Sequence, residues 1–138
     1  EDMLMNITFH KSTGIFHLYN NDISYLMMIL PNGQIGQLYF GAAIRDREDF
    51  SHLLETCYRT NLHIIPGTEH HVSGTSKTEY PVYGTSDFRE PAVEVIQENG
   101  SHLSDFQYKD TAFEHGKPHL PGLPATYTED DSEAMTLF

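Results

Sequence analysis

The dipeptide Asn-Gly occurs twice in this chain, at Asn32-Gly33 and at Asn99-Gly100. Both residue types tolerate a positive φ, which makes Asn-Gly between apolar runs the strongest short-range predictor of a β-hairpin. A tight hairpin joins antiparallel neighbours, whereas parallel strands need a crossover of a dozen residues or more. Two such dipeptides in 138 residues therefore favour an antiparallel all-β fold.

Short extended runs bounded by turn residues surround the first of these dipeptides. The run Ile23 to Leu30 is almost entirely apolar, which fits either a strand covered on both faces or a buried helical turn. The Asn32-Gly33 turn that follows favours the strand. The other predicted strands are residues 7–10, 15–19, 35–40, 92–96, 101–108 and 134–138, with an extended stretch at 126–128. Many short strands and little helix predict an antiparallel sandwich or barrel.

Two segments depart from the strand pattern. Asp46 to Leu54 is the best helix candidate, because Asp46 could cap it and Phe50, Leu53 and Leu54 share one face. Thr60 to Thr78 is weakly patterned, and it predicts a long loop with at most one strand at residues 62–65.

Charge and composition exclude several classes of partner. The formal net charge is -12, so phosphate backbones and anionic membrane surfaces are repelled, and neither a nucleic acid nor a membrane is an expected partner. Cys57 is the one cysteine, so no intrachain disulfide can form. Glu1-Asp2-Met3 begins neither a basic nor a hydrophobic leader region, and we expect a cytoplasmic protein.

Nine histidines raise the question of a metal site. Only His115 and His119 are four residues apart, and Gly116 and Pro118 between them disfavour a helix that would bring them together. The acidic pair Asp130-Asp131 lacks the twelve-residue spread of a calcium loop. We therefore expect no metal and no other cofactor.

Carboxylates close in sequence offer one candidate for acid/base chemistry. Asp87 and Glu90 flank Arg89. A glycosidase pair must face each other across a substrate, which proximity in sequence does not ensure. An Arg-carboxylate ion pair that holds a loop is the favoured interpretation. The residues alone thus predict an acidic all-β domain.

Three segments, in this order, carry a resemblance to a known family. They are Phe16-His17-Leu18 to Ser24-Tyr25 with Gly36 to Gly41; Glu79-Tyr80-Pro81-Val82-Tyr83-Gly84-Thr85-Ser86-Asp87-Phe88-Arg89-Glu90-Pro91-Ala92; and Glu98 to Ser101 with Gly116-Lys117-Pro118 and Gly122-Leu123-Pro124-Ala125-Thr126-Tyr127. Together they resemble the N-terminal region of bacterial α-galactosidases of glycoside hydrolase family 36.

The resemblance implies an architecture and an activity. It implies an N-terminal β-supersandwich of the galactose mutarotase-like kind, then a (β/α)8 barrel and a small C-terminal β domain. It also implies retaining hydrolysis of terminal α-1,6-linked galactose from melibiose and raffinose-type sugars by two barrel aspartates. Residues 1–138 would be a fragment of the first domain, so Asp46, Asp87 and Asp105 would not be the catalytic aspartates.

The resemblance further implies roles in assembly and in substrate binding. Family tetramers use the N-terminal domain for subunit contacts, and one of its loops lends polar side chains to the edge of an active site. The matching stretch here is Phe50 to Glu55, followed by Tyr58 and Arg59. Glu55 stands near the position of a family aspartate, with a one-residue gap, and is the candidate substrate-binding residue. Its alternative role is a carboxylate on a helix surface.

Two other functions stay open at this point. A stand-alone carbohydrate-binding β module would need exposed aromatic rings on one platform, and the chain has eight Phe, eight Tyr and no Trp. A small hydrolase that uses Asp87, Glu90 and Glu55 is the other alternative. Binding of galactose or raffinose would favour the module, and activity of the isolated chain would favour the hydrolase.

Overall fold

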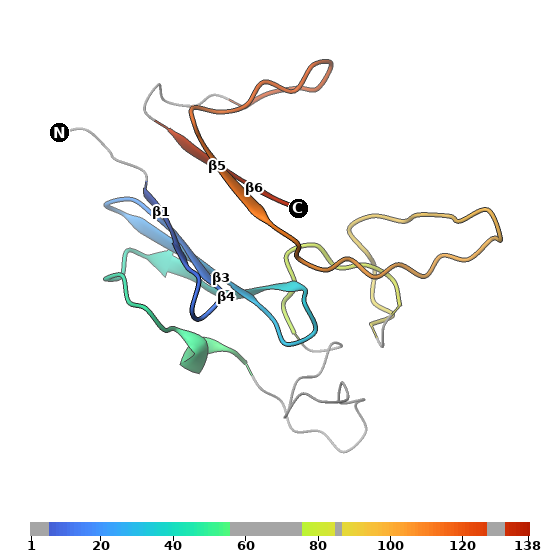
Figure 1. Cartoon of the computed structure of the whole chain (residues 1–138), viewed down its shortest axis with the longest axis horizontal. Coiled ribbons are helices and arrows are strands. Elements are labelled where there is room, and N and C mark those ends of the chain that lie inside the picture. Colours follow the sequence, from blue (N-terminus) through green and yellow to red (C-terminus); the bar gives the residue numbers. More distant parts are fainter. Residues whose placement is uncertain (1–5, 56–75, 85–86, 127–131) are drawn as a thin grey trace.

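The computed structural model describes residues 6–55, 76–84, 87–126 and 132–138. It contains the strands β1 (Asn6–His10), β2 (Ile15–Tyr19), β3 (Ile23–Ile29), β4 (Ile35–Ala42), β5 (Thr111–His115) and β6 (Glu133–Leu137), and one 3-10 turn, η1 (Ser51–Leu53). The strands form two antiparallel sheets, one of order β1-β2-β3-β4 and one of order β5-β6 (Figure 1). The all-β antiparallel prediction is confirmed.

The four-stranded sheet is a meander built on tight turns, as its sequence predicts. Gly14 takes a φ of 68° in the turn between β1 and β2. Between β3 and β4, Leu30 N–H donates to Gln34 O at 2.8 Å, and Gly33, with a φ of 84°, returns its N–H to Leu30 O at 2.8 Å. This is the three-residue hairpin loop that ends in a left-handed glycine. The four strands predicted around it are confirmed.

The two faces of this sheet bury different groups. One face packs Ile15 and Leu26 beneath Phe50, and residues 43–54 cross over it. On the other face Phe9 and Phe16 stack with ring centroids 4.2 Å apart, and Tyr108 meets both rings edge-on. Phe16 is completely buried as a result.

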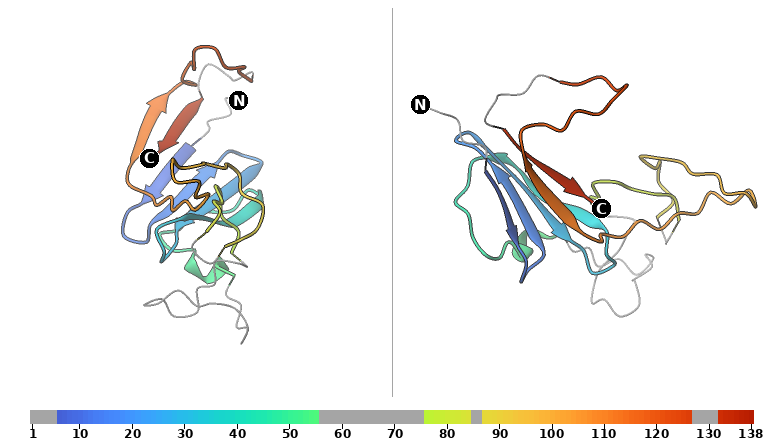
Figure 2. Two further views of the ribbon diagram at one scale, coloured as in Figure 1. Left: turned by 90° about the vertical axis from the view of Figure 1, so that its right-hand side faces the viewer. Right: turned by 45° about the horizontal axis from the view of Figure 1, so that its top comes forward.

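The second sheet lies alongside the first. Figures 1 and 2 agree in placing β6 next to β1. The Glu133 carboxylate of β6 accepts the Ile7 N–H of β1 at 3.1 Å, which occupies an otherwise open backbone donor on that edge strand. The strand predicted at 134–138 is therefore confirmed, whereas β5, its partner, was not predicted.

Three predicted elements are wrong. The helix expected over Asp46–Leu54 is reduced to the single turn η1, because hydrogen bonds to the sheet hold the residues before that turn. Residues 92–96 and 101–108 form no strands, although the turn between them exists. The predictions for residues 60–75, for Cys57 and for Asp130-Asp131 fall outside the described residues. Within the described ranges, no helix has the length and apolar character that a membrane span requires.

Candidate functional site

A segment that crosses the β1–β3 face carries a network of polar side chains. We call residues 43–50 the strap. Its backbone is tied to the sheet at both ends: Ala43 N–H donates to Asp22 O at 2.9 Å, and the Thr13 hydroxyl donates to Glu48 O at 2.7 Å. Between these ends Ile44 N–H donates to Ser24 Oγ at 3.0 Å. These bonds hold the strap against the sheet, and no helix forms over it.

His17 of β2 lies fully buried beneath the strap and uses both ring nitrogens. Its Nδ1 lies 2.7 Å from Asp46 Oδ1, and its Nε2 lies 2.9 Å from Ser24 Oγ. This connectivity is that of a Ser-His-Asp hydrolase triad. Ser24 and His17, however, are both 0% exposed, so no substrate carbonyl could reach the serine oxygen. The three groups act as a structural clamp, not as a nucleophile and base.

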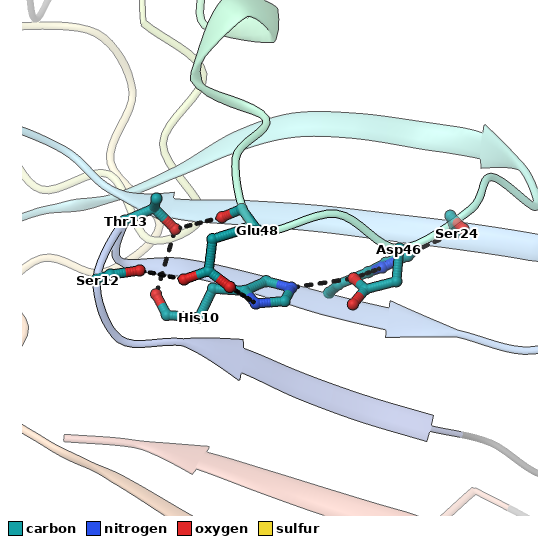
Figure 3. Close-up of polar contacts among 7 residues, drawn as sticks. His10, Ser12, Thr13, Ser24, Asp46 and Glu48 are labelled. Atoms are coloured by element: carbon teal, nitrogen blue, oxygen red, sulfur yellow. Dashed lines mark hydrogen bonds and ion pairs between the residues drawn. The ribbon is translucent and has the colours of Figure 1, made fainter.

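His10 of β1 reaches the same strap from the edge of the sheet (Figure 3). Its Nε2 lies 3.0 Å from Asp46 Oδ1, and its Nδ1 lies 3.2 Å from Glu48 Oε2. Ser12 donates to the other oxygen of the Glu48 carboxylate. Two histidines from neighbouring strands therefore converge on one oxygen of Asp46.

Asp46 is the centre of this network, and its contacts with the two histidines lower its pKa. Burial alone would raise the pKa of Asp46, but the hydrogen bonds from His17 and His10 outweigh it and hold the pKa below its ordinary value. Asp46 is therefore a carboxylate at neutral pH. It is an acceptor that anchors the strap, not a proton donor for chemistry.

The strap leads directly to the predicted substrate-binding segment. Phe50, 3% exposed, packs on Ile15 and Leu26, and its ring meets that of His17 at 5.7 Å in an edge-on contact. The Asp49 carboxylate then accepts the Ser51 N–H at 2.7 Å and starts η1. Glu55 follows two residues after η1.

Glu55 is exposed and faces a cation. Its Oε2 lies 3.5 Å from Lys77 Nζ, and both side chains are 67% exposed. An ion pair this open is worth about 0–1 kcal/mol, so the carboxylate can exchange Lys77 for another partner at little cost. Tyr58 and Arg59, its expected neighbours, lie outside the described residues.

The candidate acid/base pair forms the ion pair that was favoured instead. Asp87, 4% exposed, receives Arg89 Nε on Oδ1 at 2.9 Å and Arg89 Nη2 on Oδ2 at 2.7 Å. Arg89 Nη2 also donates to Ser76 O at 3.0 Å, which joins two segments of the chain. The Arg89 hydrogen bonds hold the pKa of Asp87 below its usual range. Glu90 is exposed and makes no ion pair with any described residue.

A groove opens between the first sheet and the β5–β6 hairpin. Its volume is about 640 Å³, and its walls include Ile35, Tyr108 and Phe138. The rings of Tyr80 and Phe106 stack in its lining at 6.2 Å and remain 56% and 44% exposed. Asp105 and Gln107 add polar groups to the same lining.

In the parts of the chain that the structure describes, no group of three or more His, Cys, Asp or Glu side chains is arranged so that it could hold a metal ion. His115 and His119 are both exposed. The neighbouring His70 and His71 fall outside those parts.

The His10–His17–Asp46 network was missed by sequence reasoning. Its members are spread from residue 10 to residue 46 and share no motif spacing. The one available indication was His17 itself, a polar residue between Phe16 and Leu18 in an apolar strand.

Comparison with known proteins gives the family. Residues 33–138 match the model of the glycosyl hydrolase family 36 N-terminal domain. The α-galactosidase AgaA of Geobacillus stearothermophilus is 38% identical over 135 residues, which cover 96% of this chain and 18% of the relative. The α-galactosidase Mel36A of Lactobacillus acidophilus is 35% identical over 143 residues, again 18% of its length. The chain thus spans less than a fifth of these relatives.

Solved structures agree with the sequence matches. The α-galactosidase from Lactobacillus brevis superimposes with a TM-score of 0.84 at 30% identity, over 94% of this chain and 18% of that one. The α-galactosidase AgaB from Geobacillus stearothermophilus gives 0.81 at 36% identity, over 96% and 18%. The predicted antiparallel β-sandwich is confirmed. This chain belongs to glycosyl hydrolase family 36 and is an N-terminal domain of that family.

Proposed function

We propose that this chain is the N-terminal domain of an α-galactosidase that releases terminal α-1,6-linked galactose from melibiose and raffinose-type sugars with retention. The observation that carries the proposal is the match of nearly the whole chain to proteins named α-galactosidases. The two aspartates that cleave the bond would lie in a (β/α)8 barrel elsewhere in the full-length, cytoplasmic enzyme, with a small C-terminal β domain after it.

Within that enzyme the domain would act as a scaffold and contribute to subunit contacts in a homo-tetramer. It would also lend Glu55 to the rim of an active site. Two features support this role for Glu55: its carboxylate is exposed, and the segment that carries it is anchored on the buried Phe50. A carboxylate is a strong acceptor for sugar hydroxyl groups.

The test is hydrolysis of p-nitrophenyl-α-galactoside by residues 1–138 and by the full-length protein, side by side. We expect activity only in the longer protein. Activity of the short chain would contradict the proposal and would return attention to Asp87, Glu90 and Glu55.

Glu55 is tested in the full-length enzyme by Glu55→Gln. We expect a higher KM for raffinose with kcat nearly unchanged, because a rim contact contributes to binding more than to bond cleavage. An unchanged KM would remove Glu55 from the active site.

One observation favours a second candidate, a carbohydrate-binding module. Tyr80 and Phe106 present stacked, exposed rings beside Asp105 and Gln107, a combination that suits the apolar face and the hydroxyl groups of a sugar. Titration of the chain with galactose and with raffinose would decide between the candidates. Binding that is lost in Tyr80→Ala would favour the module, and no binding would favour the domain of an enzyme.

A further inference from the structure

The strap lies between two histidines and the segment that carries Glu55, and both histidines contact it through Asp46. Ser24 Oγ already receives the Ile44 N–H at 3.0 Å. The same oxygen lies 2.9 Å from His17 Nε2, and His17 Nδ1 lies 2.7 Å from Asp46 Oδ1. His17 therefore joins Ser24 of β3 to Asp46 of the strap.

His10 contacts two carboxylates of the strap. Its Nε2 faces Asp46 Oδ1 at 3.0 Å, and its Nδ1 faces Glu48 Oε2 at 3.2 Å. Glu48 thus gives His10 a second contact with the strap (Figure 3). Asp46 Oδ1 is the one oxygen that both histidines share.

The network is coupled to the Glu55 segment through His17. The same buried ring that holds Asp46 at 2.7 Å packs against Phe50 at 5.7 Å. Phe50 is the last residue of the strap, η1 begins at the next residue, and Glu55 follows two residues after η1. If the strap were released from His10 and His17, Phe50 would shift from its position against His17. The Glu55 carboxylate, five residues later, would shift with it.

We infer that Asp46, held by both His10 and His17, is a positioning residue that sets the place of Glu55 at the substrate. The inference rests on the proposed rim role of Glu55. Asp46 touches no substrate and acts only through the strap.

The experiment uses the full-length enzyme and raffinose as the substrate. Asp46→Asn removes the anionic acceptor that both histidines share. We expect KM to rise about 3- to 10-fold, the range of the net contribution of one hydrogen bond, with kcat within about 2-fold of wild type. The matched control is Asp22→Asn, an exposed aspartate beside the start of the strap whose side chain makes no hydrogen bond or ion pair with the described residues.

A double-mutant cycle with Glu55→Gln separates positioning from general damage. If Asp46 acts through Glu55, adding Asp46→Asn to Glu55→Gln raises KM no further. Multiplying effects, or a wild-type KM in Asp46→Asn, would overturn the inference while the rim role of Glu55 stood. An unchanged KM in Glu55→Gln alone would instead overturn the rim role.

A milder variant guards against loss of folding in Asp46→Asn. Glu48→Gln replaces one of the two carboxylates that contact His10, and the Glu48 side chain is 66% exposed. We expect KM to rise about 2-fold and the melting temperature to stay unchanged. In the Glu55→Gln background we again expect no rise in KM. A shift that persists in that background would count against the inference.

Discussion

The two Asn-Gly turns are nearly the same structure in two different surroundings. In the first, Leu30 N–H donates to Gln34 O at 2.8 Å and Gly33 N–H to Leu30 O at 2.8 Å. In the second, Gln97 N–H donates to Ser101 O at 2.9 Å and Gly100 N–H to Gln97 O at 2.8 Å. The glycine φ values are 84° and 80°.

The segments beside these turns nevertheless differ. The first turn joins β3 and β4, whereas residues 92–96 and 101–108 beside the second form no ladder. The apolar side chains explain the difference: Leu30 is 2% exposed, whereas Ile96 and Leu103 are 65% and 53% exposed. An Asn-Gly dipeptide specifies the turn, and a ladder forms where one face of the hairpin is buried.

The largest expected effect compares the apolar residues next to each turn. Leu30→Ala should lower the free energy of unfolding by about 2–5 kcal/mol, because it empties a buried site. Ile96→Ala, at a site 65% exposed, should change it by no more than about 0.5 kcal/mol. Urea unfolding of both variants is the measurement. Equal losses would mean that the second hairpin is buried after all and that the comparison fails.

The same contrast explains what the sequence could and could not predict. The β1–β4 strands were predictable because each turn was followed by residues that the sheet buries. The strands at 92–96 and 101–108 satisfied the same local pattern, but periodicity does not report whether another part of the chain covers a face. β5 was missed because Thr111-Ala112-Phe113-Glu114-His115 has only one large apolar residue, and its strand depends on pairing with β6.

The strap was missed for a tertiary reason. Asp46 followed by apolar residues at helical spacing is a sound helix start. In the structure the Asp46 carboxylate accepts hydrogen bonds from His17 and His10, and no helix begins there. Glu55, by contrast, was identified from a family resemblance, and its local surroundings contain nothing that would identify it alone.

The second expected effect concerns the ion pair that holds the segment before the second turn. Asp87→Asn should lower stability by about 1–3 kcal/mol at pH 7, because the buried oxygens keep Arg89 at 2.7 and 2.9 Å. The pKa of Asp87 is lowered in the folded chain, so this stability is present above the ordinary carboxyl pKa of about 3.9 and is lost as pH falls through the folded value.

Thermal unfolding between pH 7 and pH 2 measures this linkage. Wild type should lose melting temperature below about pH 4 more steeply than Asp87→Asn, because the variant has no carboxylate to protonate at that position. The pKa of Asp46 is also lowered, so Asp46 contributes to the fall of melting temperature at low pH in both proteins. Parallel curves for the two proteins would show that Asp87 contributes no linkage.

The third effect compares the two glycines. Both have a positive φ, so an alanine at either position should cost about 1–2 kcal/mol of backbone strain. A Cβ at Gly33 would lie 3.2 Å from Gln107 Cβ, whereas at Gly100 nothing lies within 4 Å. Gly33→Ala should therefore destabilise the chain more than Gly100→Ala in urea unfolding. The reverse order would mean that the second turn is the more tightly packed of the two.

The smallest expected effect exchanges a residue between the two turns. Pro31 precedes Asn32-Gly33, and Glu98 holds the equivalent place before Asn99-Gly100. Since the turns share their hydrogen bonds and proline suits the first position of such a turn, Glu98→Pro should fit without strain. It stiffens a hairpin whose flanking side chains are exposed, so we expect the melting temperature to rise by no more than about 2 °C, while protease cleavage near Gly100 slows. A larger rise in melting temperature would mean that the second hairpin unfolds together with the core. The hairpin would then belong to one cooperative unit with β1–β4, despite its exposed side chains. A fall would show that the two turns differ in backbone geometry despite their common bonds.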